Sequence, residues 1–361
     1  MLGTDLEIAL HKATDEQRRE KPDQDSLGFG QFFSDHMFVM HWNRERGWHD
    51  ARIQPYQDFA IDPAAMVFHY GQAIFEGLKA YRGRDDQIFL FRPRDNLKRL
   101  NQSALRMCMP RVPEERTLQA LKALVYLDRD WVPDNEGATL YLRPTMIATE
   151  PALGLRPSEE YIFFVINSPV GAYYSEGFNP VKIYVEDTYV RAVPGGVGAA
   201  KTAGNYAASV KALTEAQRKG YTQVLWLDAV ERRYIEEVGT SNIFFVIDSE
   251  LITPPLGGTI LPGITRDSVL QLGRDWGLKV SERPITIDEV VAASEDGTLQ
   301  EVFGSGTAAV ISPIGELCYR DRNIVVNNGE TGELSRRFFD ALQAIQYGHR
   351  EDPHGWRVRV G

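Results

Sequence analysis

Lys201 lies in a segment whose residue types favour covalent chemistry on a carbonyl group. The glycine-rich run 195–198 precedes it, and the segment 202–206 opens an alanine-rich stretch that we expect to be helical. Small neighbours let the backbone pack closely, so that an aromatic wall could shield the amine from water. Because desolvation disfavours an ammonium ion, such an amine can attack a carbonyl and form a Schiff base. The alternative is a solvated lysine on a surface helix, the commoner situation.

Three kinds of feature could hold a phosphate or another anion. Ile264 and Thr265 follow a Pro-Gly pair at the expected start of a helix, where backbone amides have no partner within the helix. The segment 304–307 follows an expected strand, and we predict a tight turn that offers amides and two hydroxyls. Arg99 and Arg191 could each supply a guanidinium fork. Each feature is a weak signal by itself, because a Pro-Gly pair before a helix is commonly only a helix start and Gly-Ser-Gly is usually only a turn.

Length and composition indicate a two-domain globular protein. The chain has 361 residues, with 43% hydrophobic and 25% charged residues, which is too long for one ordinary core and typical of folded domains. The net charge of −10 argues against nucleic-acid binding and against affinity for anionic membranes. With two cysteines, no signal-like N-terminus and no apolar run of about 20 residues, we expect a cytoplasmic protein without disulfides, membrane spans or a metal site.

The hydrophobic pattern predicts helices and strands in both halves without a regular βαβ rhythm, and therefore an α+β fold. Strands are expected at 38–42, 87–91, 139–143, 161–166, 181–185, 223–227, 242–247, 250–253 and 301–303. Helices are expected at 95–108, with Asp95 as cap and Cys108 in the apolar stripe, and at 205–219, 263–276 and 335–347. The segment 173–180 has linker composition. We therefore divide the chain into an N-terminal domain, 1–172, and a C-terminal domain, 181–361.

A series of motifs between residues 32 and 312 resembles one known family. These motifs are 69–71, 75–80, 90–93, 96–100, 141–144, 169–173, 195–206, 236–244, 261–266 and 303–308. In this order they resemble the branched-chain amino acid aminotransferases, pyridoxal-phosphate enzymes of fold type IV and of the class IV aminotransferase family. The resemblance implies a smaller N-terminal α/β domain, a larger cofactor-binding C-terminal domain, a site at their interface and a homodimer.

The resemblance also implies a role for individual residues. Lys201 would form the Schiff base with pyridoxal 5'-phosphate and act as the catalytic acid and base, Glu237 would pair with the pyridine nitrogen, and Tyr206 would contact the phenolic oxygen. The phosphate would be held by Arg99, Arg191, Ile264, Thr265 and Thr307. The substrate carboxylate would be oriented by Tyr70, Arg143, Thr240 and Ala308, and the substrate side chain would meet Phe75, Tyr141 and Tyr173. Without the resemblance, Glu237 could be a solvated carboxylate at a strand end, and the aromatics could be core residues.

The implied reaction is transamination of L-leucine, L-isoleucine and L-valine with 2-oxoglutarate, which gives branched-chain 2-oxo acids and L-glutamate. Apolar walls separate substrates by only about 1–3 kcal/mol per methylene, so breadth among the aliphatic substrates is expected. Arg143 is the candidate for binding the γ-carboxylate of glutamate. The alternatives are a D-amino acid aminotransferase or aminodeoxychorismate lyase of the same fold, and a catalytically silent binding relative. A nicotinamide oxidoreductase is disfavoured because the run 195–198 lacks GxGxxG spacing. Ala309 and Ser312 stand where some relatives carry a CxxC pair, so no thiol switch is expected.

Overall fold

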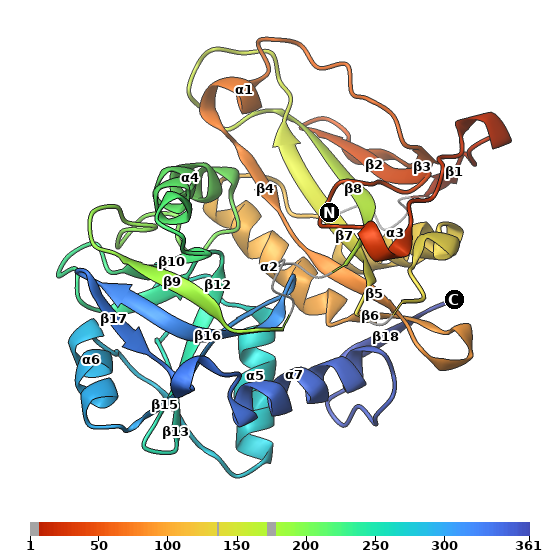
Figure 1. Ribbon diagram of the computed structural model, residues 1–361. Helices are drawn as coiled ribbons and strands as arrows, with labels where there is room; N and C mark the ends of the chain where they lie inside the picture. Colours follow the sequence, from red (N-terminus) through yellow and green to blue (C-terminus); the bar gives the residue numbers. More distant parts are fainter. Residues whose placement is uncertain (1–6, 136, 172–177) are drawn as a thin grey trace. The chain divides into compact units, whose positions relative to one another are not determined.

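The chain folds into two compact units (Figure 1). The computed structural model describes residues 7–135, 137–171 and 178–361. Unit 1 comprises Met1–Tyr173, Ala200–Ala203 and Ala344–Gly361, and unit 2 comprises Tyr174–Ala199 and Gly204–Gln343. The four residues around Lys201 thus belong to unit 1, although both flanking segments belong to unit 2. The expected linker 173–180 lies largely outside the described residues, and the boundaries drawn from the sequence stay a prediction.

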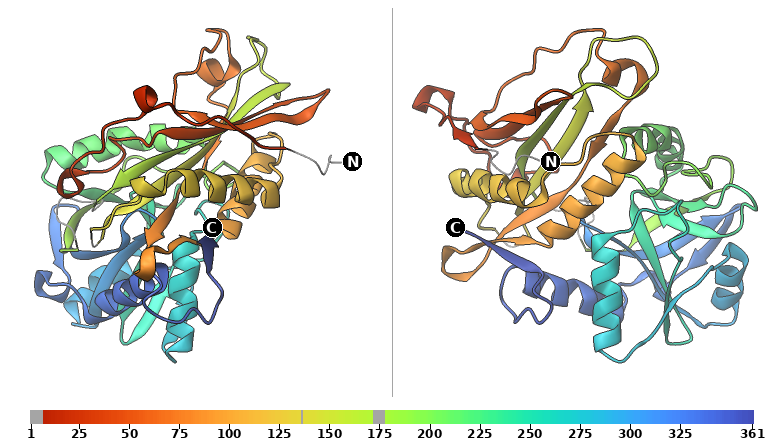
Figure 2. Two further views of the ribbon diagram at one scale, coloured as in Figure 1. Left: turned by 90° about the vertical axis from the view of Figure 1, so that its right-hand side faces the viewer. Right: turned by 180° about the vertical axis from the view of Figure 1, so that it is seen from behind.

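Unit 1 is built on one sheet with the strand order β1-β3-β2-β8-β7-β5-β6-β18, and β4 also pairs with β7. The strands are β1 (Ala9–Leu10), β2 (His36–Asn43), β3 (Gly47–Pro55), β4 (Ala73–Phe75), β5 (Leu78–Arg82), β6 (Ile88–Phe91), β7 (Thr139–Ala148), β8 (Glu160–Val170) and β18 (Arg357–Val360). The helices are α1 (Met66–Tyr70), α2 (Pro93–Arg106) and α3 (Glu114–Leu127). Helix α3 packs against β2, β18 and α2 (Figure 2).

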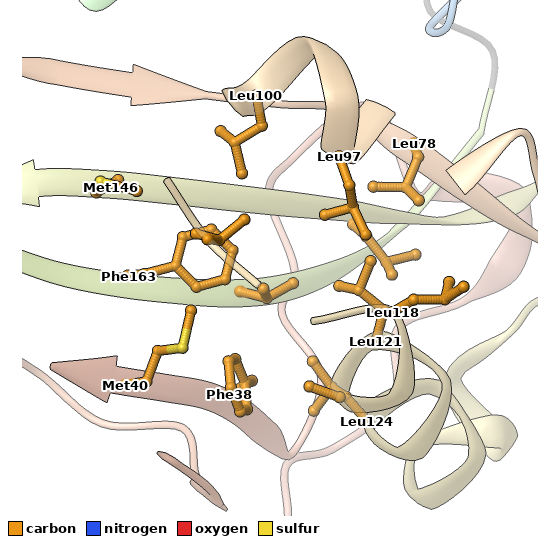
Figure 3. Close-up of a cluster of buried hydrophobic side chains, with 14 of the residues drawn as sticks. Phe38, Met40, Leu78, Leu97, Leu100, Leu118, Leu121, Leu124, Met146 and Phe163 are labelled. Carbon is orange, nitrogen blue, oxygen red and sulfur yellow. The ribbon is translucent and has the colours of Figure 1, made fainter. Parts of the chain in front are cut away.

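The core of unit 1 fixes helix α2, which carries Arg99. Leu97 and Leu100 of α2 and Leu121 of α3 belong to one buried cluster with apolar side chains of the sheet such as Phe163 (Figure 3). The apolar residues recur every three or four positions, which places them on one face of each helix. Burying a leucine or phenylalanine side chain completely contributes about 1.5–3 kcal/mol. This packing holds α2 in one position against the sheet.

The ends of α2 differ from the sequence-based expectation. The helix begins at Pro93, and its N-cap is Arg92 in the left-handed conformation (φ 51°). Proline is preorganised for the first helical position, so the helix starts before Asp95, which instead accepts a hydrogen bond from Arg92 Nε at 2.7 Å. The helix ends at Arg106, and Cys108 is exposed with φ 54°. The predictions of Asp95 as cap and of Cys108 in the apolar stripe were therefore wrong.

Unit 2 contains a closed ring of six strands. The sheet order is β11-β10-β9-β16-β15-β12-β13-β14, β17 pairs with β16, and an additional pairing of β11 with β12 closes the ring. The strands are β9 (Val181–Glu186), β10 (Gln223–Leu227), β11 (Ile235–Val238), β12 (Ser241–Ile247), β13 (Glu250–Thr253), β14 (Lys279–Glu282), β15 (Leu299–Gly306), β16 (Val310–Tyr319) and β17 (Arg322–Val325). The helices are α4 (Ala203–Arg218), α5 (Ile264–Asp275), α6 (Ile287–Glu295) and α7 (Glu333–Gln346). The part of the chain that the structure describes contains no helix long and apolar enough to cross a membrane.

The glycines near residue 305 lie in a strand rather than in a turn. Gly304, Ser305 and Gly306 form the end of β15 and pair with both β12 and β16. A Cβ at Gly304 would lie 3.1 Å from Val238 Cγ1, and glycine in a strand often marks such a close approach. The predicted turn at 304–306 was wrong, because the chain turns only from Thr307 onward.

Candidate active site

Lys201 is fixed in unit 1 by pairing with β4. Thr202 forms an antiparallel bridge with Ile74, and the Phe75 N–H donates to the Lys201 carbonyl at 3.0 Å. On the other side, the Lys201 N–H donates to Ser103 Oγ of α2 at 2.9 Å. The backbone of Lys201 is therefore held between strand β4 and helix α2. This fixes the position of the Cα atom from which the side chain extends.

The amine of Lys201 lies in an environment that favours its neutral form. Its Nζ is 5.0 Å from the centroid of the Phe75 ring. Part of the residue remains accessible. The pKa of the amine is nevertheless lowered to about 8, mainly by burial and also by the charge of Arg99, while the charge of Glu76 opposes the change. The alternative of a solvated surface lysine does not hold.

Arg99 forms a bidentate ion pair with Glu76. The two nitrogen–oxygen distances are 2.8 and 2.9 Å, and the residues are 6% and 0% exposed. Asn96 Nδ2 donates to the same carboxylate at 2.8 Å. Burial alone would raise the pKa of Glu76, but the charge and hydrogen bonds of Arg99 outweigh it and hold that pKa below its usual value. The pair fixes the orientation of the guanidinium group.

Glu76 is a residue that the sequence analysis missed. Its position inside the conspicuous segment 75–80 was noticed, but nothing in the spacing shows that a carboxylate there meets an arginine 23 positions later. The signal in the sequence is an acid between an aromatic residue and a glycine. Such an acid, if buried, needs a partner, because an acid is rarely buried without one.

Three of the expected substrate residues lie together in unit 1. The guanidinium carbon of Arg143 is 4.8 Å from the Phe75 ring centroid and 5.2 Å from that of Tyr141, and Nη2 donates to Tyr141 Oη at 3.2 Å. Gly77 makes room for this arrangement, because a Cβ there would lie 1.8 Å from Tyr141 Oη. Tyr141 and Arg143 also act on the amine pKa of Lys201. The four residues thus form one cluster of aromatic and cationic groups.

The structure does not place two further expected residues in this cluster. Tyr70 ends α1 on the surface, 39% exposed, and its hydroxyl donates to the backbone carbonyl of Leu153. Tyr173 lies outside the described residues. The substrate roles of both residues therefore stay predictions.

In unit 2, Glu237 is a buried carboxylate with several partners. It lies on β11, is 3% exposed, and pairs with Arg191 at 3.1 Å between Oε2 and Nε. Its Oε1 accepts the Leu261 N–H at 2.8 Å and Asn242 Nδ2 at 3.5 Å. The alternative of a solvated strand-end carboxylate was therefore wrong.

Arg191 is oriented by backbone carbonyls. Its side chain is 8% exposed, and Nη2 donates to the carbonyls of Thr259 and of Gly198, the latter at 3.3 Å. These contacts direct Nε toward Glu237. Unit 2 therefore contains a guanidinium group that is buried, oriented and paired with a carboxylate.

The expected anion elements of unit 2 lie at the ends of regular elements. Helix α5 begins at Ile264 with Gly263 as its N-cap, and Ile264 and Thr265 are 8% and 5% exposed. Thr307 and Ala308 directly follow β15 and are partly exposed. Ser305 carries one of the two hydroxyls expected in the segment 304–307, and its buried Oγ has no partner among the residues that the structure describes. An unsatisfied buried hydroxyl is unusual and marks a place where a ligand atom could bind.

The remaining predicted residues lie on the surface or half-buried in unit 2. Thr240 is exposed in the turn between β11 and β12, and Tyr206 is half-buried in the first turns of α4. Position alone assigns neither residue a ligand, so their roles stay predictions.

Comparison with known proteins gives one family. The family model described as amino-transferase class IV matches residues 73–317. A protein of Bacillus subtilis (strain 168), "Branched-chain-amino-acid aminotransferase 2", is 56% identical over 95% of this chain and 94% of its own length. The crystal structure of the Escherichia coli branched-chain amino acid aminotransferase has a TM-score of 0.77 and 28% identity over 91% of this chain and 99% of that one. The Thermobaculum terrenum branched-chain amino acid aminotransferase in its PLP-form has a TM-score of 0.74 and 26% identity over 91% and 98%. The α+β, two-unit architecture agrees with these fold type IV structures, and the chain belongs to the class IV aminotransferase family.

Proposed function

We propose that this chain is a branched-chain-amino-acid aminotransferase that uses pyridoxal 5'-phosphate. It transfers the amino group of L-leucine, L-isoleucine or L-valine to 2-oxoglutarate. The observation that carries this proposal is Lys201, an amine anchored by backbone hydrogen bonds beside an aromatic ring, with a pKa of about 8. The names of relatives that are 48–56% identical support the substrate class.

The residues present fit the cofactor. When bound, pyridoxal 5'-phosphate supplies an aldehyde that combines with amines and a protonated ring that withdraws electrons from the substrate Cα. Arg99 and Arg191 are buried cations suited to a phosphate, and Ser305 Oγ is a buried hydroxyl with no partner among the described residues. We propose that the phosphate is held by Arg99, Arg191, Ile264, Thr265 and Thr307. Glu237 would pair with the pyridine nitrogen, and Tyr206 would contact the phenolic oxygen.

Lys201 acts in this proposal as both anchor and proton carrier. With a pKa of about 8, about a tenth of the amines are neutral at pH 7, and a neutral Nζ can accept the proton from the substrate Cα. The resulting ammonium can return the proton to the neighbouring carbon, so one flexible amine serves as general base and general acid. Burial and the charge of Arg99 favour the neutral form of the amine, whereas the charge of Glu76 favours the ammonium form.

The substrate side of the proposal divides between orientation and discrimination. Phe75, Tyr141 and Tyr173 provide the apolar wall, and Tyr70, Arg143, Thr240 and Ala308 orient the carboxylate. Arg143 lies against two rings with its Nε buried and unsatisfied among the described residues. That placement suits it to a second carboxylate, such as the γ-carboxylate of glutamate.

We also propose that the protein is a homodimer in the cytoplasm with small molecules as its other partners. Both cysteines are free, which fits a reducing compartment. The division into a domain 1–172, a linker 173–180 and a domain 181–361 remains part of this proposal.

Borohydride trapping tests the proposal. Protein incubated with pyridoxal 5'-phosphate should absorb near ~410–430 nm and, after reduction, carry the pyridoxyl group on Lys201 in a peptide mass spectrum. Lys79 is the internal comparison, because it is also buried and burial lowers its pKa to about 8. L-Leucine with 2-oxoglutarate should be converted faster than D-alanine or 4-amino-4-deoxychorismate. Label on Lys79 instead, or preference for D-alanine, would refute the assignment.

A further inference from the structure

Strand β11 carries two adjacent buried glutamates, and only one of them has a role so far. Glu236 is 7% exposed. Its Oε1 accepts a hydrogen bond from Thr259 Oγ1, and its Oε2 is buried with no partner in the part of unit 2 that the structure describes. Burial raises the pKa of Glu236, while the Thr259 hydrogen bond and the charge of Arg191 oppose the rise. Burying a carboxyl group away from water costs free energy, so packing alone does not explain the position of Glu236.

Thr259 connects Glu236 to Arg191. The Thr259 hydroxyl donates to Glu236, and the Thr259 carbonyl accepts from Arg191 Nη2. Arg191 Nε in turn pairs with Glu237. Two neighbouring carboxyl groups thus contact the same arginine, one directly and one through a threonine.

The loop 254–263 that contains Thr259 is tightly seated. It joins β13 to α5, and Ala199 N–H donates to the Gly258 carbonyl at 3.1 Å. A Cβ at Gly198 would lie 2.3 Å from the Thr259 carbonyl oxygen, so only glycine permits this approach. Glu237 forms a further contact with this loop, because its Oε1 accepts a hydrogen bond from the Leu261 N–H. The loop then runs directly into Ile264, the first residue of α5.

We propose that Glu236 is a positioning residue: through its hydrogen bond with Thr259, it holds the loop 254–263 so that Arg191 and the N-terminus of α5 grip an anionic group together. This inference rests on the proposed function, in which that group is the phosphate of the cofactor. Glu236 does not touch the ligand. It acts through the Thr259 hydroxyl, which loses its buried acceptor when Glu236 is removed, and through the Thr259 carbonyl, which then no longer orients the guanidinium group.

Four variants separate the hydrogen bond from the volume of the side chains. Glu236→Leu removes the acceptor and Thr259→Val removes the donor, whereas Glu236→Gln and Thr259→Ser keep the acceptor and the donor. The apo-protein is titrated with pyridoxal 5'-phosphate and, separately, with pyridoxal, which lacks the phosphate. Affinity for pyridoxal 5'-phosphate should fall about 10-fold or more in Glu236→Leu and Thr259→Val, as expected for one buried hydrogen bond. Affinity for pyridoxal should stay within about twofold of the wild type, and the two conservative variants should bind both compounds normally.

The outcomes are distinct. Equal losses for both compounds would show that Glu236 serves only the stability of unit 2, and unchanged affinities in all four variants would show that it has no positioning role. The double variant should lose no more affinity than either single one, because both changes break the same contact. Thermal unfolding of each apo-protein identifies variants that fail to fold. If Glu236→Leu fails to fold, the affinities of Thr259→Val decide whether the inference holds.

If the wild type binds neither compound, the proposed function is refuted. The same variants are then compared by the thermal shift that inorganic phosphate produces, and equal shifts in the wild type and in Thr259→Val would overturn the inference.

Discussion

The lowered pKa of Lys201 leads to a quantitative prediction about its reactivity. An amine with a pKa of about 8 is about one-tenth neutral at pH 7, whereas an ordinary lysine is neutral in roughly one molecule in 3,000. At pH 7, Lys201 of the apo-protein should therefore react with an acylating reagent roughly 300 times faster than a surface lysine whose neutral amine is equally nucleophilic. Because the neutral base is the reactive form, the rate should rise with pH and level off above about pH 8 to 9.

Competitive labelling followed by peptide mass spectrometry measures this profile residue by residue. Lys211 is the internal control, because its hydrogen bond with Glu215 raises its pKa, and its labelling should still increase above about pH 10. The perturbation is Glu76→Gln, which removes the negative charge that favours the ammonium form of Lys201. The midpoint for Lys201 should then move to lower pH, while the midpoint for Lys211 should not change.

Two results would refute this reasoning. A wild-type profile for Lys201 that runs parallel to that of Lys211 would mean that burial does not control the amine. A midpoint that moves to higher pH in Glu76→Gln would mean that Glu76 acts on Lys201 mainly through the position of Arg99 rather than through its own charge.

Three further predictions concern single side chains. Gly77→Ala places a methyl group against the Tyr141 hydroxyl and should raise KM for L-leucine about 10-fold or more. Gly204→Ala, where an added Cβ meets no atom within 4 Å, should leave KM unchanged. Glu301→Ala removes the acceptor for two amides and the Ser335 hydroxyl at the start of α7, so the free energy of unfolding should fall by about 2–3 kcal/mol in urea titrations. Arg143→Ala should reduce kcat/KM for L-glutamate more than for L-leucine, and equal losses would contradict a role in binding the γ-carboxylate.

Much of the fold was predictable because its strands carry local patterns. The alternating segment 181–185 and the apolar segment 223–227 became β9 and β10 almost without change. The closure of the ring was not predictable, because the pairing of β11 with β12 in addition to β10 depends on where distant strands lie. Helix α3 was not among the predicted elements, although its leucines at every third position from 118 to 124 are a local helical pattern.

In the candidate site, the sequence points only to residues whose chemical type is unusual for their surroundings. Lys201 and the two arginines could be singled out because amines and guanidinium groups rarely lie beside glycines or apolar stripes by chance. Glu76 and Glu236 could not, because their roles depend on partners 23 residues away along the chain. The burial of Glu237 was equally invisible from the sequence, since an acid at a strand end looks the same whether water or Arg191 lies beside it.

Strand β18 can join the sheet of unit 1 only late in the synthesis of the chain. It is formed by Arg357–Val360, yet it pairs with β6, more than 250 residues earlier, and belongs to unit 1. During synthesis on the ribosome, β6 therefore remains an edge strand of this sheet until residues 357–360 have emerged. Exposed strand edges recruit other chains, so nascent molecules that stall before residue 357 should be the ones that chaperones retain or that aggregate.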